Sequence, residues 1–303
     1  MKEMLLMKKN KAITFTIIFR ANSLNYGEGT ANISELKKFH RGDGGVYSFA
    51  SRQSLRYDMI RLGNQFFDWN LDVVDKAQGV IQFKQDSSIK DSVEMDLFGY
   101  MKTKAKEGAT KRSAVVRLSH AISLEPYKSD LEFLNNMGLA ARINDTANLA
   151  TIEQHISYYA YTVTIDLNRI GVDLDIELSA EEKTERVNQF LEITKFLNRE
   201  IRGRQENLAP LFVIGGAYPI ANPFFQGRIS LNNQSDTLNI EALKDTTDST
   251  VFGKAIKDLT RIGYVKGICG NEDEFPEIAA CGSVDAFYEG LKNEVAEHYG
   301  VPV

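Results

Sequence analysis

Cysteine, proline and histidine are scarce in this chain of 303 residues, which has two, six and four of them. Cys269 and Cys281 form no CxxC pair and have no histidine cluster nearby, so we expect buried thiols and neither a disulfide nor a zinc site. The chain also lacks Ser/Gly-rich stretches and long blocks of one charge, which excludes a long flexible linker. We therefore expect one domain that carries insertions.

Long apolar runs are missing too. The run from Met4 to Met7 is followed by Lys8 and Lys9, and the run from Ile13 to Phe19 ends at Arg20. Neither run has the length of a membrane-spanning helix or the pattern of a signal peptide. We expect a cytoplasmic protein with no membrane partner.

The chain has none of the common catalytic or nucleotide-binding motifs. It contains no G-x-x-x-x-G-K-[ST], no G-x-G-x-x-G after a strand, no HExxH and no serine elbow. Its histidines, His40, His120, His155 and His298, are dispersed, so each is interpreted as a structural or surface residue. The sequence predicts no cofactor and no metal.

Charge is unevenly distributed. The net charge of −5 argues, taken alone, against a nucleic-acid partner. However, residues 37–61 carry six Lys and Arg against two Asp, and residues 102–117 carry six Lys and Arg against one Glu. Charge counts alone leave two interpretations open for these basic islands, a solvated face or a surface that binds a polyanion.

The first strand and the first helix are the clearest elements of the N-terminal part. Residues 12–20 alternate and are rich in Ile, Thr and Phe, which predicts a strand. A helix is expected to begin at Ser51, because a buried stripe with helical spacing follows: Leu55, Met59, Leu62 and Phe66. At about 100° per residue, Arg52, Gln53 and Arg56 fall together on the flank of this stripe. All three can reach one ligand.

The rest of the pattern predicts a mixed α+β chain. The expected elements are a short helix over 33–39, a hairpin over 73–85, strands over 114–124, 158–167, 211–217 and 227–231, and helices over 129–137, 180–202, 251–262 and 283–299. This order matches a split βαβ arrangement of the ferredoxin or RRM type with long insertions. Such a fold hosts many functions and decides none of them.

Several short motifs follow one another over nearly the whole chain. They include Asn22-Ser-Leu-Asn-Tyr-Gly-Glu-Gly29, Ser51-Arg-Gln-Ser-Leu-Arg-Tyr57, Asp96-Leu-Phe-Gly-Tyr100, Ser119-His-Ala-Ile-Ser-Leu-Glu-Pro126 and Gly215-Gly-Ala-Tyr-Pro219. In this order they resemble the DevR-type backbone subunit of the type I-B CRISPR Cascade complex, a member of the RAMP superfamily. Each motif is weak alone, and their collinearity makes the resemblance specific.

The resemblance implies a hand-shaped α+β protein. A single RAMP-type domain over 1–303 would contain an RRM/ferredoxin-like palm, a finger insertion over about 63–113 and a β-hairpin thumb over about 124–157. Many copies would polymerise along one CRISPR guide RNA and leave its bases free to read target DNA. The implied partners are therefore guide RNA, the target DNA strand by way of the guide, other copies of the chain and other Cascade subunits.

The resemblance also assigns RNA contacts. The family's Ser-x-Gln-x-x-(Lys or Arg) helix start contacts RNA phosphates and maps onto Ser51, Gln53 and Arg56, with Arg52 at the variable position. A helix N-terminus and a forked guanidinium both suit a phosphate. Further expected contacts lie after the first strand, in the basic finger loop and in the thumb: Arg20, Asn22, Asn25, Gly27, Arg41, Lys104, Lys111, Arg112, Phe133, Leu134 and Met137. The three thumb residues are equally consistent with the buried stripe of an ordinary short helix.

Two other functions remain open at this stage. Backbone subunits of type III complexes in the same superfamily cut RNA with a loop aspartate, and Asp43 and Glu28 lie in a glycine-rich loop. A metabolic α+β enzyme is the third possibility. We expect a non-catalytic RNA-binding subunit, with RNA cleavage as the alternative.

Overall fold

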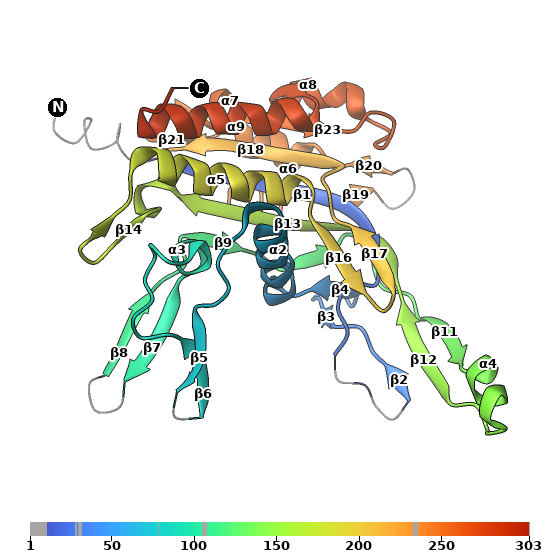
Figure 1. The fold of residues 1–303 in the computed structure, drawn as a ribbon. Coiled ribbons are helices and arrows are strands. Elements are labelled where there is room, and N and C mark those ends of the chain that lie inside the picture. The colour runs from blue at the N-terminus through green and yellow to red at the C-terminus, as the bar shows by residue number, and fades with distance from the viewer. Residues whose placement is uncertain are drawn as a thin grey trace.

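The computed structural model describes residues 11–27, 29, 32–77, 79–104, 108–232 and 236–302. A nine-stranded sheet lies at the centre of this part of the chain (Figure 1). Its strands are β1 (Ala12–Asn22), β3 (Lys38–His40), β4 (Val46–Ala50), β9 (Val116–Leu118), β10 (Ala121–Ser123), β13 (Ile156–Asp166), β18 (Phe212–Tyr218), β23 (Thr260–Tyr264) and β24 (Ala280–Gly282). They follow the order β24-β23-β18-β1-β13-β10-β4-β3, and β9 pairs with β13 beside β10.

Strand β1 is the middle of this sheet. It pairs antiparallel with β13 over its whole length, from Ala12 opposite Asp166 to Asn22 opposite Ile156, and antiparallel with β18 on its other side. Its alternating side chains therefore supply both faces of the sheet. The strand expected over 12–20 is confirmed and continues to Asn22.

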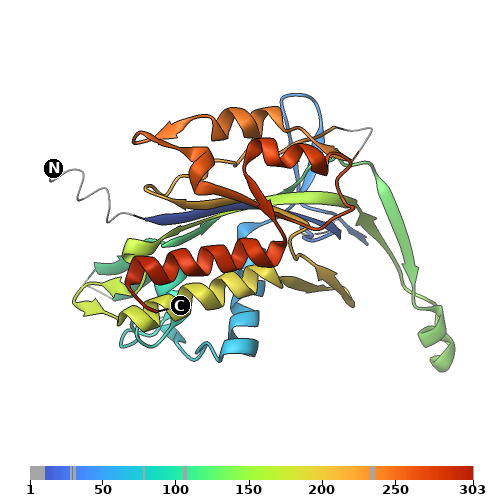
Figure 2. The same ribbon diagram turned by 90° about the horizontal axis from the view of Figure 1, so that it is seen from above.

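Three long helices cover one face of the sheet. They are α2 (Arg52–Phe67), α5 (Ala180–Lys195) and α9 (Val284–Tyr299). Ser51, Ser179 and Ser283 cap them, each accepting a hydrogen bond on its side chain from an N–H three residues later. Apolar side chains of all three helices belong to one buried cluster with Ile13, Phe15, Ile17 and Phe19 of β1. Figure 2 shows α5 and α9 together on this side, with the helices of residues 241–278 across the sheet.

The opposite face is partly covered by residues 219–259 and 265–279, on either side of β23 in the sequence. These stretches contain β19 (Leu231–Asn232), β20 (Thr237–Leu238), α6 (Glu241–Thr247), β21 (Thr250–Val251), β22 (Lys254–Ala255), α7 (Ile256–Leu259), η3 (Glu272–Glu274) and α8 (Phe275–Ile278). The helix expected over 251–262 is wrong. Phe252 and Gly253 have φ angles of 49° and 76°, so the chain turns tightly between β21 and β22 and only a short helix follows.

Two arms project from the sheet in the same direction, and α2 lies between them (Figure 1). The two-hairpin arm consists of β5 (Val74–Ala77), β6 (Val80–Phe83), α3 (Val93–Phe98), β7 (Tyr100–Lys104) and β8 (Gly108–Arg112). The long-hairpin arm consists of β11 (Asp130–Asn135), α4 (Met137–Ala140), η1 (Ala141–Ile143) and β12 (Leu149–Gln154). The hairpin expected over 73–85 is confirmed. The helix expected over 129–137 is wrong, because residues 130–135 pair with β12 as an exposed strand.

The remaining elements are short strands and one 3-10 turn outside the nine-stranded sheet. They are β2 (Ile33–Ser34), η2 (Leu167–Arg169), β14 (Val172–Asp173), β15 (Ile176–Glu177), β16 (Asn198–Ile201) and β17 (Arg204–Asn207). Strand β2 pairs in parallel with β12, so the short helix expected over 33–39 is wrong. Helix α5 ends at Lys195 and not at residue 202, because the β16–β17 hairpin follows it.

The mixed α+β class expected from the sequence is confirmed. Both cysteines are free, but Cys281 is exposed and Cys269 only half-buried, so the expectation of two buried thiols is wrong. No helix within the described ranges has the length and apolar character needed to cross a membrane.

Candidate nucleic-acid interface

The first turn of α2 borders two adjoining hollows. The sheet hollow, of about 550 Å³, lies against β1, β13 and the β9–β10 edge. The helix hollow, of about 540 Å³, lies between α2, the end of α3 and β9. Both are lined by Arg52, Arg117 and Leu118, so they adjoin along these residues, and the two together are called the groove.

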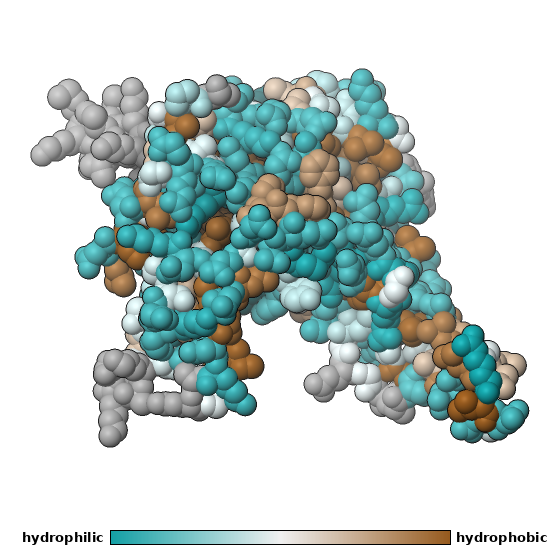
Figure 3. Space-filling model, viewed as in Figure 1, coloured by the Kyte–Doolittle hydropathy of each residue, from teal (hydrophilic) through white to brown (hydrophobic). Residues whose placement is uncertain are grey.

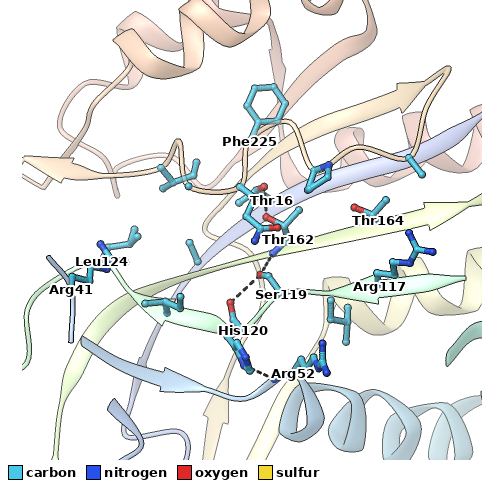
Figure 4. A pocket seen from close by; sticks show the side chains of 18 residues that line it. Thr16, Arg41, Arg52, Arg117, Ser119, His120, Leu124, Thr162, Thr164 and Phe225 are labelled. Carbon is cyan, nitrogen blue, oxygen red and sulfur yellow. Dashed lines mark hydrogen bonds between the residues drawn. The ribbon is translucent and has the colours of Figure 1, made fainter. Parts of the chain in front are cut away.

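Arginines from three separate elements surround the sheet hollow. Arg41 follows β3, Arg52 begins α2 and Arg117 lies in β9, and all three are exposed (Figure 4). The floor of this hollow is uncharged. It includes Thr16 and Thr162, whose hydroxyls share a 2.8 Å hydrogen bond. A hollow with a neutral floor and cationic sides suits an anion that carries a less polar group, such as a nucleotide.

Arg56 extends the cationic side into the helix hollow. Its Nη2 lies 2.5 Å from Oε1 of Glu94 on α3, and its guanidinium lies 5.2 Å from the centre of the Phe98 ring. These contacts hold the side chain in place and neutralise part of its charge. Gln53 also lines this hollow and is exposed, as expected for a residue on the flank of α2.

A β-bulge lies between β9 and β10. Leu118 pairs with Val163 and Ile122 with Ala160, so three residues of this edge face two residues of β13. Ser119 closes the gap, since its N–H donates to the Thr162 carbonyl (3.0 Å) and its Oγ accepts from the Thr162 N–H (2.9 Å). The extra residue places His120 beside the start of α2 (Figure 4).

His120 anchors the first turn of α2. Its Nδ1 accepts a 3.1 Å hydrogen bond from the Arg52 backbone N–H, and its ring packs edge-on against Phe39 and Phe49. Burial lowers the pKa of His120, and the charges of Arg52 and Lys37 lower it further. The imidazole therefore favours its neutral form, which can accept on Nδ1.

The N-cap of α2 is more occupied than the sequence suggested. Ser51 Oγ accepts from the Ser54 N–H (3.2 Å), and the Arg52 N–H is bound to His120. The backbone N–H groups of Arg52 and Ser54 therefore have acceptors within the chain and are not free to bind a phosphate. Ser51 is buried and caps the helix, which leaves the side chains of Arg52 and Gln53 to meet a ligand.

The predicted contacts at the end of β1 and just after it lie apart from the two hollows. Arg20 is exposed and lies 5.7 Å from the centre of the Tyr158 ring. Asn22 accepts from Ser23 on its side chain (2.7 Å), the Asn25 amide oxygen lies 3.4 Å from the Ser51 nitrogen, and the Gly27 N–H donates to the Glu35 carbonyl (2.8 Å). These four positions line neither hollow.

Arg112 differs most from its predicted place. It was expected in an exposed basic loop, but its guanidinium is buried and pairs with Asp96 at 2.7 Å. It also donates to the Arg169 carbonyl (2.7 Å), so it connects the base of the two-hairpin arm to η2, which follows β13. Lys111 is exposed on β8, whereas the side chain of Lys104 lies outside the described part of the structure.

The three thumb candidates are exposed on the long-hairpin arm. Phe133 and Met137 are 62% and 65% exposed, and Leu134 is 39% exposed. They do not form the buried stripe of a packed helix, which was the alternative interpretation. Figure 3 shows hydrophobic side chains gathered toward the end of this arm.

Asp43 stabilises its own turn. Its Oδ1 accepts from the Gly45 N–H (2.7 Å), and its Oδ2 accepts from the Tyr47 hydroxyl (3.2 Å). Within the described ranges, no three His, Cys, Asp or Glu side chains gather as a metal site would require. Glu28 lies outside the described residues.

Sequence reasoning missed two groove residues. Arg117 was counted in the second basic island but was not assigned a contact, because it lies in a predicted strand. His120 was interpreted as a structural or surface residue, and its hydrogen bond to the Arg52 N–H makes it structural, but its place at the groove was not predicted. The motif Ser119-His-Ala-Ile-Ser-Leu-Glu-Pro126 contained the only signal, and neighbouring charge gave no sign that it meets α2.

Comparisons with known proteins identify the family. The family model described as CRISPR-associated negative auto-regulator DevR/Csa2 matches residues 13–232. A chain of a CRISPR RNA-guided surveillance complex, pre-nicking, has a TM-score of 0.61 at 12% identity over 94% of this chain and 100% of its own. A chain of another CRISPR RNA-guided surveillance complex has a TM-score of 0.54 at 14% identity over 94% of this chain and 99% of its own.

These two likenesses show a shared fold, since their sequence identity is low. Among curated proteins, no sequence matches the chain. The family model, however, spans most of the 303 residues. This chain belongs to the DevR/Csa2 family of CRISPR-associated proteins.

Proposed function

We propose that this chain is the non-catalytic, guide RNA-binding backbone subunit of a type I-B CRISPR surveillance complex, and that many copies polymerise along one RNA. The observation that carries the proposal is the groove at the start of α2, which Arg41, Arg52 and Arg117 line from three parts of the chain. No carboxylate of the described ranges pairs with Arg52 or Arg117. Their charge is available to a polyanion.

The proposed architecture is an RRM/ferredoxin-like palm within one RAMP-type domain over 1–303. The order β18-β1-β13-β10, with α2 and α5 packed on one face, supports this assignment. The two-hairpin arm corresponds to the fingers over about 63–113, and the long-hairpin arm to the thumb over about 124–157. The groove lies at the start of α2, between the two.

In this proposal the groove binds phosphates and leaves sequence to base pairing. Guanidinium groups contact any RNA backbone alike, and the guide reads the target DNA strand through its exposed bases. Arg56 contributes less charge than Arg52 because Glu94 pairs with it. Arg20 and Lys111, both exposed, are proposed as outer contacts with the same strand.

The thumb is proposed to wedge apolar side chains beside the bases. Phe133, Leu134 and Met137 are exposed on a paired hairpin, which holds them away from the sheet. Contacts with base faces suit a guide of any sequence, because every base has a π-face. Other copies of the chain and other Cascade subunits are the proposed neighbours in the assembled complex.

The direct test is assembly on RNA of increasing length. Purified chain is mixed with single-stranded RNAs of several lengths and unrelated sequences, and the mass of each complex is measured by native mass spectrometry. The proposal predicts that the number of bound copies rises stepwise with length and does not depend on sequence. A single copy on every RNA, or no binding, contradicts it.

RNA cleavage is tested in the same samples. Labelled RNA is incubated with the chain, with and without magnesium, and is expected to stay intact. Cleavage that disappears in Asp43→Asn would overturn the non-catalytic assignment, because asparagine keeps the acceptor for the Gly45 N–H and removes only the charge.

A further inference from the structure

The outward face of α2 carries a row of uncharged side chains. Gln53, Tyr57 and Asn64 are exposed and recur at helical spacing with Ile60, which is partly buried against the core, while the opposite face buries Leu55, Met59 and Leu62. The row lies on the side of α2 away from its buried residues, and α2 itself lies between the two arms (Figure 1). It contrasts with the charged residues on its flanks.

The two flanks of this row differ in availability. On one side, the exposed Arg52 borders both hollows. On the other side, Arg61 donates to the side-chain oxygen of Asn198 (2.7 Å) and lies beside Asp58, so its charge is already committed to the β16–β17 hairpin. A phosphate bound to α2 is therefore expected on the Arg52 side.

Tyr57 is the aromatic member of the row. Its side chain is 66% exposed, and within the described ranges it has neither a ring partner nor a hydrogen bond. Single exposed aromatic residues are common, so exposure alone assigns no role. The position of Tyr57 suggests a role. Gln53 lines the helix hollow, and Tyr57 follows Gln53 one helical turn later, with the two Cβ atoms about 5–6 Å apart.

We propose that Tyr57 is a stacking surface for one unstacked nucleobase of the RNA whose phosphate lies in the helix hollow. The inference rests on the proposed function and adds a base contact to its phosphate contacts. A phosphate beside Arg52 places the attached nucleoside over the uncharged row. The phenol ring stacks on any base, and Gln53 offers an amide donor and acceptor to the sugar or base edge between them.

The test separates ring from charge with matched RNAs. Binding constants are measured for a single-stranded RNA and for an abasic strand of equal length, using the wild type, Tyr57→Phe and Tyr57→Leu. Stacking on one base accounts for about 5- to 100-fold in affinity. Tyr57→Leu should lose that factor with the RNA and none with the abasic strand, whereas Tyr57→Phe should bind both as the wild type does.

The outcomes also distinguish this inference from the function on which it rests. If wild type binds RNA but Tyr57→Leu binds both strands as wild type does, the stacking role is wrong and the groove stands. Equal losses of Tyr57→Leu on both strands would also overturn it. If wild type binds neither strand, the proposed function itself fails and the stacking role fails with it. Because Tyr57 is uncharged, the salt dependence of binding should stay unchanged in both variants.

Discussion

The backbone N–H of Arg52 donates a 3.1 Å hydrogen bond to Nδ1 of His120, which ties the first turn of α2 to the bulge between β9 and β10. While Nδ1 accepts this bond, the neutral imidazole carries its proton on Nε2. His120 then has no free lone pair to act as a general base. It acts as a second cap of α2 and positions Arg52 in the groove.

This cap predicts a difference between two substitutions at position 120. His120→Ala leaves the Arg52 N–H without its acceptor and should lower the free energy of unfolding by about 0.5–1.5 kcal/mol. His120→Asn should lower the free energy of unfolding by less, because the asparagine Oδ1 can take the place of Nδ1 as the acceptor. Urea denaturation of both variants measures the difference, and equal losses would show that the hydrogen bond contributes little.

The same residue predicts a pH dependence of stability. Burial, Arg52 and Lys37 lower the pKa of His120 in the folded chain, whereas the unfolded chain has the ordinary value of about 6.5. The unfolded state thus binds the proton first as pH falls, so stability is lost between the ordinary pKa and the lowered one. The free energy of unfolding, measured from pH 8 to pH 5, should decline less in His120→Asn than in wild type. Parallel curves would contradict the assignment.

Arg112 is predicted to affect stability and not RNA binding. Arg112→Ala leaves the buried carboxylate of Asp96 with Arg186 and the Gly171 N–H but without its nearer cation, which should cost about 3–5 kcal/mol of unfolding free energy. Adding Asp96→Asn to this variant should recover part of the loss in a double-mutant cycle. A stable Arg112→Ala chain with a shallower salt dependence of RNA binding would instead make Arg112 an RNA contact.

The contrast between Arg112 and Arg52 shows what the sequence could predict. Both belong to basic islands, and local charge counts treat them alike. Helical spacing and the serine cap placed Arg52 correctly on an exposed flank, because those signals are local. The partner of Arg112 is on α3, 16 residues away, and its other contacts come from the segment after β13, so no local pattern could show that it is buried.

The helix predicted over residues 129–137, in the long-hairpin arm, was wrong for a related reason. Leu131, Leu134 and Met137 recur every three residues, which favours a helix when a stretch is taken alone. Pairing with β12 overrides that preference, and the partner strand lies beyond α4 and η1. The position of His120 at α2 was missed because it depends on a bulge that is formed by register against β13. Strand pairing is a tertiary property that periodicity does not contain.

If the thumb wedges apolar side chains beside the bases, substitutions there should lower RNA affinity without lowering stability. Phe133 and Met137 are exposed, so replacing both by serine should change the free energy of unfolding by no more than about 0.5 kcal/mol each. RNA affinity should fall about 5- to 100-fold with no change in salt dependence, because no charge is removed. Phe252→Ser, at an exposed phenylalanine away from both arms, is the matched control. Equal RNA affinity of wild type, the double serine variant and Phe252→Ser would contradict the proposed wedge.

The salt dependence of RNA binding tests the groove most directly. The binding constant for one single-stranded RNA is measured over a range of salt concentrations for wild type, for Arg52→Ala with Arg117→Ala, and for Lys90→Ala with Lys254→Ala. The second pair removes the same charge from exposed positions that line neither hollow. The groove predicts a log–log slope shallower by about 1.4 in the arginine variant alone, since each lost phosphate contact removes about 0.7. Equal slopes in the two double variants would contradict it.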